Sequence, residues 1–272
     1  MTDPSSRTEL RRQRLRRRRI TIVAAISVVV LAIGALGYFV VGGDDGSKSS
    51  AVPTTNAAVP GASTGITATF ASAPLRSAIS KGGEIAVYPM PDAKATPTST
   101  LTAQTEYQFP RSFLAFDQYQ DWLHVYLPAR PNSSTGWIKA SDVAIMKPVE
   151  YEIKVTLAQN KLTLLHNGVV ELEAPAAIGT DENPTPTGTF FYTDPLDLSS
   201  DPSTAYGVFA IGLSGHSNTL SEFNGGDGQI AIHGTNDPGA IGTKVSHGCV
   251  RVNNDIVLRL SKLPLGTPVV IT

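Results

Sequence analysis

Alternating apolar and polar positions recur from about residue 80 onward and indicate short β-strands. Along residues 122–127, aromatic rings and a histidine alternate with aliphatic side chains, so the two sets would face opposite sides of one strand. Similar runs at 84–88, 153–157 and 161–165 predict further strands. The triplet His166-Asn167-Gly168 predicts a tight hairpin turn after the last of these. Outside the amino-terminal segment, one helix is predicted, over residues 254–263 with an Asx cap at its start.

The longest apolar run lies near the amino terminus, at Ile20–Val41, and contains no charged residue. As a helix it would extend roughly 33 Å at about 1.5 Å per residue, which matches a bilayer core. Residues 1–19 carry eight arginines against two acidic residues, which predicts a cytoplasmic segment before a single-pass anchor. A cleaved signal peptide is the alternative, but the apolar run is long for one and residues 40–44 make a poor cleavage site.

Composition separates the rest of the chain into a linker and two predicted domains. Residues 42–78 are mostly Gly, Ser, Thr, Ala and Pro, which predicts a flexible linker. Domains are then predicted at 79–146 and 150–272. The net charge of −1 hides an asymmetry, because everything after residue 19 carries 14 basic and 21 acidic residues. That acidic body argues against nucleic-acid binding. The arginines before the apolar run predict that the rest of the chain is exported, and the linker would keep it near the outer face of the membrane.

The single cysteine, Cys249, has two histidines near it in sequence. A thiol becomes a nucleophile when an imidazole takes its proton, so the pairing suggests covalent catalysis. An apolar run at 230–232 predicts a strand that ends at His233, and Gly234 opens the loop leading back to Gly248-Cys249. The amides of Gly248 and Cys249 are expected to form an oxyanion hole. The plainer alternative is a buried, inert core cysteine.

Two motifs in order resemble the L,D-transpeptidase family, also called the YkuD family. One is SHGCVR at 246–251, with the pair His233-Gly234 sixteen positions before Cys249. The other is NPTPTGTF at 183–190. The resemblance covers the final 120 or so residues and implies a mainly β protein with a β-sandwich-like YkuD catalytic domain and no cofactor or metal. A zinc site from the histidines and Cys249 is the disfavoured alternative, because the short paired spacings of zinc sites are missing.

This resemblance implies a thioester mechanism on peptidoglycan stem peptides. Cys249 would attack a tetrapeptide stem with release of D-Ala, and an amine of a second stem would resolve the thioester into a 3→3 cross-link. His233 would act as base, its ring oriented by the carbonyl of Gly234, and its removal is expected to raise the thiol pKa toward about 8.5. Carbapenem β-lactams are implied covalent inhibitors. The predicted substrate-binding residues are Ser246, His247, Arg251 and His216, with a structural salt bridge and a solvated loop histidine as alternatives for the last two.

A second resemblance concerns residues 79–146. The stretches WLHVYLPAR and TGWIK are similar to the end of a bacterial SH3-like domain, which implies a small SH3-like β-barrel. Its aromatic residues are expected to serve packing and positioning more than peptide binding. Removing residues 79–146 is therefore expected to leave acylation of Cys249 within about tenfold.

Other functions remain open on these residues. A cysteine endopeptidase of the NlpC/P60 type also pairs Cys and His with SH3-like domains, but there the cysteine precedes the histidine. Hydrolysis of wall peptides, as in a carboxypeptidase, or attachment of a wall protein would use the same acyl-enzyme. A non-catalytic wall-binding protein would not need an intact SHGC motif.

Overall fold

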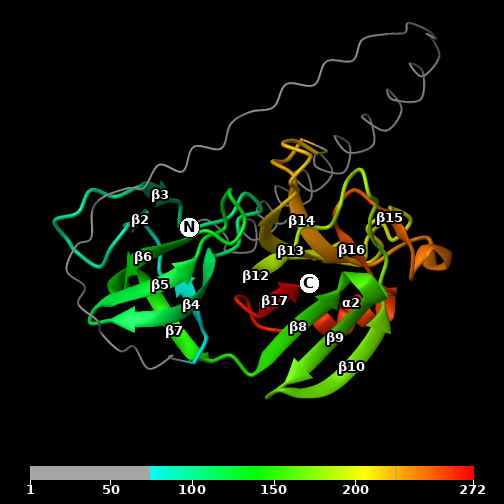
Figure 1. Ribbon diagram of the computed structural model, residues 1–272, viewed down its shortest axis with the longest axis horizontal. Coiled ribbons are helices and arrows are strands. Elements are labelled where there is room, and N and C mark those ends of the chain that lie inside the picture. The colour runs from blue at the N-terminus through cyan, green and yellow to red at the C-terminus, as the bar shows by residue number, and fades with distance from the viewer. Residues whose placement is uncertain (1–73, 224) are drawn as a thin grey trace, which may run out of the picture. The chain divides into compact units, whose positions relative to one another are not determined.

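Figure 1 shows the computed structural model, which describes residues 74–223 and 225–272. The predicted basic segment 1–19, the predicted anchor 20–41 and most of the predicted linker 42–78 lie outside these residues. Within the described ranges, none of the helices is long and apolar enough to cross a bilayer. The anchor therefore stays a prediction.

The N-terminal region, residues 74–148, is built on a five-stranded antiparallel sheet in the order β6-β5-β4-β1-β7 (left in Figure 1). A two-stranded ladder, β2-β3, accompanies it. The bounds are β1 (Arg76–Ser80), β2 (Ile85–Val87), β3 (Ser99–Leu101), β4 (Ser112–Tyr119), β5 (Trp122–Tyr126), β6 (Thr135–Lys139), the 3₁₀ turn η2 (Ala140–Asp142) and β7 (Val143–Pro148).

Strand β5 shows why this sheet forms. Leu123 and Val125 are fully buried in the core of the region, whereas His124 lies on the other face and stacks on Trp137 with ring centroids 4.5 Å apart. The predicted alternation is thus confirmed, with one exception. Trp122 is also buried, against the edge of Tyr88 at 4.9 Å. The SH3-like character of the region stays a prediction.

The predicted bounds of this region are too narrow at both ends. Residues 76–78 were expected to belong to the linker, but β1 already begins at Arg76 and pairs with both β4 and β7. At the other end, β7 continues to Pro148 rather than stopping at residue 146. The sequence RSAIS has little apolar character, and its strand depends on the partners on either side.

The C-terminal region, residues 150–272, contains an eight-stranded sheet in the order β10-β9-β8-β17-β12-β13-β14-β16, and a small parallel pair, β11-β15. Most neighbours are antiparallel, but β17 pairs with β8 in parallel and β14 pairs with β16 in parallel. The bounds are β8 (Tyr151–Thr156), η3 (Leu157–Gln159), β9 (Lys161–His166), β10 (Val169–Pro175), β11 (Ile178–Gly179), β12 (Gly188–Asp197), β13 (Phe209–His216), β14 (Gln229–His233), η4 (Pro238–Ala240), β15 (Lys244–Ser246), β16 (Val250–Arg251), α2 (Asn254–Leu260) and β17 (Pro268–Ile271).

Strands from both halves of this sheet contribute side chains to one hydrophobic core. It contains fully buried side chains of β8 and β9 together with those of β12, β13 and β14, so the sheet encloses its own core (right in Figure 1). The mainly β architecture is therefore as predicted. The predicted hairpin between β9 and β10 is also confirmed, because Asn167 and Gly168 both have positive φ, at 51° and 78°.

Helix α2 is shorter than predicted and is capped differently. It ends at Leu260 rather than residue 263, and Asn253 at its N-cap makes no side-chain capping hydrogen bond. Val257 and Leu260 are fully buried in the core, which explains why the helix forms. Packing of one apolar face, rather than a polar cap, stabilises so short a helix.

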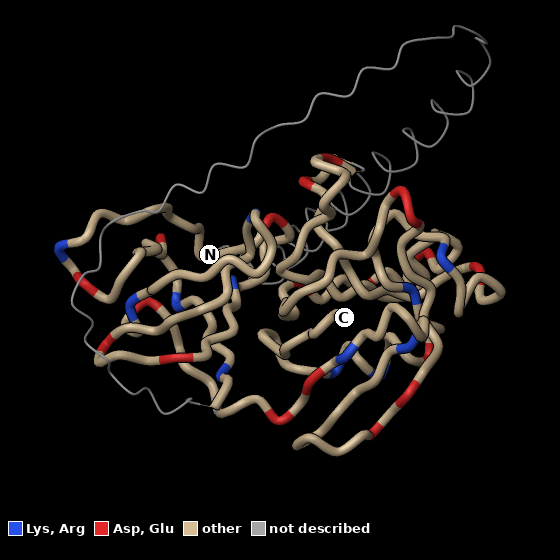
Figure 2. The backbone as a smooth tube through the Cα atoms, viewed as in Figure 1, with Lys and Arg blue, Asp and Glu red and all other residues tan. Residues whose placement is uncertain are grey.

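Charged residues are spread over both regions, as Figure 2 shows. The ion pairs that they form, such as Arg259–Glu171 at 2.6 Å and Lys161–Glu173 at 2.8 Å, are partly exposed to solvent. Exposed pairs contribute little, typically about 0–1 kcal/mol, so burial of the two cores dominates the stability.

Buried hydroxyl groups connect the two regions. Ser77 Oγ donates to the carbonyl of Leu265 at 2.6 Å, and Ser112 Oγ donates to the carbonyl of Tyr192 at 3.0 Å. Tyr192 is itself almost fully buried. These bonds link β1 and β4 of the N-terminal region to the turn before β17 and to β12, so the two regions are in contact.

Candidate active site

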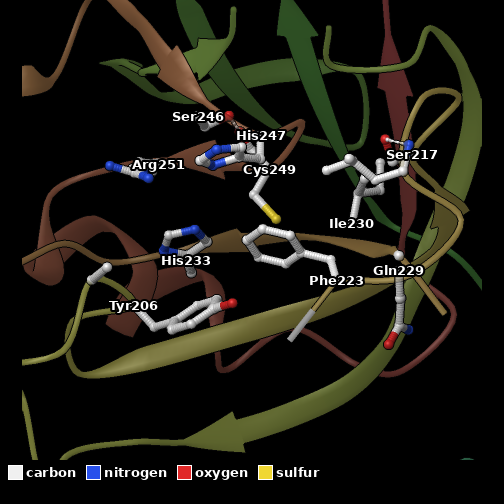
Figure 3. Close-up of a pocket in the computed structure, with 13 residues that line it drawn as sticks. Tyr206, Ser217, Phe223, Gln229, Ile230, His233, Ser246, His247, Cys249 and Arg251 are labelled. Atoms are coloured by element: carbon white, nitrogen blue, oxygen red, sulfur yellow. Dashed lines mark hydrogen bonds between the residues drawn. The ribbon is translucent and has the colours of Figure 1, made fainter. Parts of the chain in front are cut away.

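A cavity of about 200 Å³ opens beside the parallel pair β14-β16, and the ring of His233 and the sulfur of Cys249 both face it (Figure 3). Strand pairing accounts for this meeting, because Ile232 lies opposite Val250, the residue after Cys249. The lining residues are Ala205, Tyr206, Ser217, Leu220, Phe223, Gly228, Gln229, Ile230, His233, Ser246, His247, Cys249 and Arg251.

His233 is held by backbone and by an aromatic ring. Its Nδ1 lies 2.6 Å from the carbonyl oxygen of Gly234, and its ring lies 4.8 Å from that of Tyr206. A carbonyl oxygen only accepts, so the ring proton lies on Nδ1 and Nε2 keeps its lone pair. The contact predicted between His233 and Gly234 is therefore present.

The protonation state of His233 follows from its burial. It is 3% exposed, and burial lowers its pKa from the ordinary 6.5 to about 4. The positive charge of Arg251 lowers the pKa further, while hydrogen bonds to the backbone of Gly234 and Tyr206 oppose the shift. At neutral pH the imidazole is consequently uncharged and able to accept a proton.

Cys249 is a free thiol, partly exposed, that lines the cavity directly before β16. Burial raises its pKa, although the backbone of Ala231 and the charge of Arg251 act in the opposite direction. The resting pair is therefore a neutral thiol beside a neutral imidazole. For this geometry we expect His233 not to depress the thiol pKa, because a neutral ring supplies no charge to stabilise a thiolate.

The turn before Cys249 is organised by Ser246. Gly248 has φ of 119°, a backbone conformation suited to glycine, and its amide donates to Ser246 Oγ at 3.1 Å. Ser246 Oγ donates in turn to the carbonyl of Cys249 at 2.5 Å. The Gly248 amide is thus occupied, which corrects its predicted role as an oxyanion donor. The amide of Cys249 has no hydrogen-bond partner within the described chain and remains available.

His247 and Arg251 both reach the cavity, as their positions two residues from Cys249 predict. His247 is exposed, and its ring lies 5.3 Å from that of Phe223. Arg251 is half-buried, and its Nε is buried without a partner in the part of the chain that the structure describes. A positively charged group with a free donor beside the thiol is suited to hold an anionic part of a ligand.

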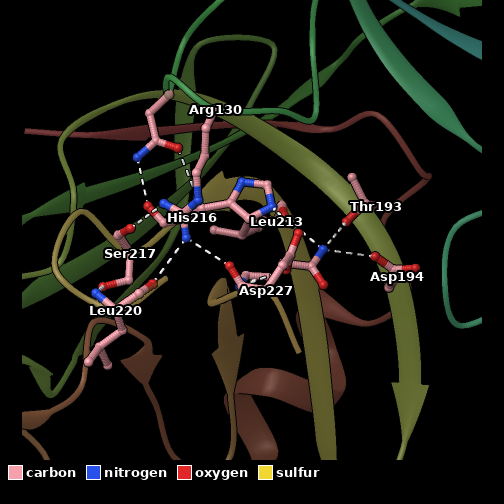
Figure 4. A network of polar contacts seen from close by, with 10 residues as sticks. Arg130, Thr193, Asp194, Leu213, His216, Ser217, Leu220 and Asp227 are labelled. Atoms are coloured by element: carbon pink, nitrogen blue, oxygen red, sulfur yellow. Dashed lines mark hydrogen bonds and ion pairs between the residues drawn. The ribbon is translucent and has the colours of Figure 1, made fainter. Parts of the chain in front are cut away.

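His216 does not line this cavity. It is 6% exposed, and its Nε2 lies 2.8 Å from Asp227 Oδ2 (Figure 4). It faces a different cavity, shared by the two regions, so its predicted place in the substrate pocket is wrong, as is the alternative of a solvated loop histidine. The candidate zinc set is likewise not brought together. The end of β13 turns this side chain away from Cys249.

Some cavity-lining side chains were not predicted from the sequence. They come from the segment before β13 and from the loop between β13 and β14. Tyr206 packs on the catalytic candidate His233, and Leu220 and Phe223 cover the opposite side. The available signal was the presence of two large apolar residues in an otherwise polar stretch at 217–228. Which way they face depends on tertiary contacts.

Asn254 was also missed, and it fixes the backbone behind His233. Its Oδ1 accepts from the amide of Thr235 at 3.0 Å, and its Nδ2 donates to the carbonyl of the same residue at 3.0 Å. An added Cβ on Gly207 or Gly234 would lie 2.2 or 2.1 Å from Asn254 Oδ1. Glycine at both positions therefore lets the amide of Asn254 reach this backbone, which includes the Gly234 carbonyl that orients His233.

The catalytic region is similar in sequence to a known family and to named bacterial proteins. Residues 150–271 match the family model of the L,D-transpeptidase catalytic domain, YkuD. The chain is 30% identical over 151 residues to a Bacillus subtilis protein named as an L,D-transpeptidase, YkuD, covering 53% of this chain and 83% of the relative. A Bacillus licheniformis protein of the same name is 30% identical over 153 residues, covering 54% and 84%.

Solved structures give more distant matches. An L,D-transpeptidase from Mycobacterium smegmatis aligns with a TM-score of 0.38 and 15% identity, over 69% of this chain and 99% of that one. An L,D-transpeptidase solved with imipenem aligns with a TM-score of 0.35 and 14% identity, over 73% and 82%. The assignment rests on the two Bacillus relatives, and it agrees with the Cys249–His233 geometry. The chain belongs to the YkuD family of L,D-transpeptidases and carries that family's catalytic domain.

Proposed function

We propose that this L,D-transpeptidase forms 3→3 cross-links in peptidoglycan through an acyl-enzyme on Cys249. The supporting observation is the placement of a free thiol and a neutral, backbone-anchored imidazole on the walls of one cavity. A neutral base with its acceptor nitrogen free is what a protonated thiol requires for attack.

In the first half-reaction, the Cys249 sulfur attacks the carbonyl of the third residue of a tetrapeptide stem, while His233 Nε2 takes the thiol proton. The amide of Cys249 donates to the developing oxyanion. The tetrahedral intermediate then collapses: the C–N bond to D-Ala breaks and His233 returns the proton to the leaving amine. A thioester and free D-Ala are the products.

In the second half-reaction, the side-chain amine of a second stem attacks the thioester, and His233 takes the amine proton. The C–S bond breaks, the thiolate recovers the proton, and an amide links the two stems. Arg251 is proposed to hold a carboxylate of a stem, since its half-buried, positively charged side chain lines this cavity and its Nε has no partner in the described part of the chain. Ser246 shapes the turn rather than contacting the peptide bond.

The test is mass spectrometry of the intact protein after mixing with a tetrapeptide stem. We expect a mass increase equal to the stem minus D-Ala, located on Cys249 by peptide mapping. Addition of a second stem should then yield a cross-linked dimer. A tripeptide product without dimer would show that water is the acceptor, and no adduct with a folded protein would contradict the proposal.

A carbapenem should give the same adduct without a leaving group. Opening of its strained lactam by the Cys249 sulfur forms a thioester that retains the whole inhibitor, so the mass increase should equal the mass of the carbapenem. The carbapenem adduct should also lie on Cys249, and peptide mapping of the modified protein checks this.

We further propose that the protein is anchored in the bacterial cell membrane by residues 20–41, with residues 1–19 in the cytoplasm and the catalytic domain in the wall. The support is the charge-free run that follows eight arginines. Full-length protein should fractionate with membranes, and protease added outside intact spheroplasts should remove the catalytic domain. A mature protein that begins near residue 44 would show cleavage instead.

A further inference from the structure

The loop between β13 and β14 forms one wall of the Cys249 cavity. We call residues 217–223 and 225–228 the wall loop. Leu220 and Phe223 line the cavity from this loop, and Phe223 also packs near His247 at 5.3 Å between ring centroids. Figure 3 shows the Phe223 ring facing the same space as the sulfur of Cys249. The position of this loop therefore sets the shape of the substrate site.

Hydrogen bonds within the wall loop close its base and its tip. The amide of Ser217 donates to the carbonyl of Gly228 at 2.8 Å, and Phe223 and Gly226 exchange bonds of 2.9 and 3.0 Å. Because these bonds join loop residues only to each other, they do not fix the position of the loop relative to the rest of the cavity. Several of its carbonyl groups find their donors outside the loop.

Arg130, in the connection between β5 and β6 of the N-terminal region, supplies those donors (Figure 4). Its Nη1 donates to the carbonyl of Ser217 at 2.5 Å, and its Nη2 donates to those of Leu220 at 3.0 Å and Asp227 at 2.7 Å. Two of these carbonyls lie near the start of the wall loop and one near its end. A planar guanidinium holds several acceptors at fixed separations, which a flexible single amine does not.

Asn132 binds the chain just before the same loop. It accepts from the amide of His216 at 2.8 Å and donates to the carbonyl of His216 at 2.7 Å. Its Nδ2 also lies 3.1 Å from Asn218 Oδ1. Arg130 and Asn132 thus bind the loop from one short connection of the N-terminal region.

The loop backbone is shaped to admit Arg130. Gly228 has φ of 78°, and an added Cβ would lie 2.3 Å from the carbonyl oxygen of Leu220 and 3.0 Å from Arg130 Nη2. A side chain at this position would separate the guanidinium from its acceptors. The close approach of two chain segments and the arginine therefore requires glycine.

We propose that Arg130 is a positioning residue for the transpeptidase site: it holds the wall loop so that Leu220 and Phe223 confine the substrate beside Cys249. The residues lining the cavity all belong to the C-terminal region, yet part of their arrangement depends on the N-terminal region. The inference rests on the proposed function for its kinetic readout. It also changes the expectation for deletion of residues 79–146, which removes Arg130 and Asn132 and should cost more than tenfold.

Three variants of the full-length protein test the proposal: Arg130→Ala, Arg130→Lys and Ser112→Ala. Arg130→Ala should lower the second-order rate of Cys249 acylation by stem peptide or carbapenem by about tenfold or more, mainly through weaker binding. Alkylation by iodoacetamide, a small probe that needs no confined site, should stay within about twofold. Arg130→Lys should recover only part of the loss, since one ammonium does not reach three carbonyls.

Ser112→Ala is the matched control, because it removes a buried hydrogen bond between the same two regions that involves no residue of the wall loop. It should leave acylation unchanged. Hydrogen exchange followed by mass spectrometry supplies a readout independent of activity: exchange at 217–228 should increase in Arg130→Ala and not in Ser112→Ala. If wild-type protein is not acylated, the proposed function fails while this readout still tests the loop.

Unchanged exchange at 217–228 and acylation within twofold in a folded Arg130→Ala protein would overturn the proposal. A uniform increase in exchange across both regions would also overturn it, because Arg130 would then act on overall stability alone. Should Arg130→Ala fail to fold, Arg130→Lys decides, since it keeps the charge and the stem but loses the fork geometry.

Discussion

Cys249→Ala is expected to abolish D-Ala release, stem cross-linking and carbapenem adduct formation, with a loss of at least about a thousandfold in each rate. No other thiol exists in the chain to replace it. The fold should persist, because the cysteine is partly exposed and its side chain belongs to neither hydrophobic core. Its melting temperature should accordingly stay within a few degrees of wild type.

The matched control for this variant is Val245→Ala. Val245 is 39% exposed, lies in β15 four residues before the cysteine and does not line the cavity. Its rates should equal those of wild type. Residual stem acylation in Cys249→Ala at a rate near wild type would remove the nucleophile assignment.

His233→Ala is expected to reduce acylation by about a hundredfold or more, the usual contribution of a positioned general base. Because the pKa of His233 is lowered to about 4, wild-type acylation should persist well below pH 6 and fall as the ring is protonated near pH 4. His247→Ala should reduce acylation by less than tenfold, since that ring is exposed at the cavity rim.

Iodoacetamide alkylation against pH separates the role of base from that of thiolate stabiliser. Burial raises the pKa of Cys249, so the wild-type midpoint should lie above the ordinary thiol value. A neutral His233 does not stabilise the thiolate, and its removal should not raise that midpoint further. The partly exposed His166 on β9, replaced by Gln, serves as control. If His247→Ala lost acylation and His233→Ala retained it fully, the base would be His247 and the assignment to His233 would be wrong.

The linear motifs made the centre of the site predictable. His233 ends an apolar strand and Cys249 directly precedes another, and parallel pairing of β14 with β16 brings the two residues close together. The contact of His233 with the Gly234 carbonyl was implied by the family resemblance, and the structure contains it. Regular alternation also predicted strands such as β5 and β8, whose burial follows the sequence pattern.

Features that depend on distant side chains were not predictable. The amide of Gly248 was expected to face the substrate, but a hydroxyl two residues earlier takes it. Nothing local indicates that Arg130 reaches the wall loop about 90 residues away, or that His216 pairs with Asp227 instead of facing Cys249. The start of strand β1 was not predicted for a related reason, because the strand is stabilised by pairing with β4 and β7 rather than by its own sequence.

The place of β17 has a consequence for how this enzyme folds. The final strand, Pro268–Ile271, sits in the middle of the eight-stranded sheet, between β8 at the start of the domain and β12. Until the last residues are available, β8 and β12 have no shared partner, and two unpaired strand edges are exposed. Completion of the sheet therefore requires a contact between residues nearly a whole domain apart in sequence, which favours slow folding and makes removal of residues 268–271 disruptive.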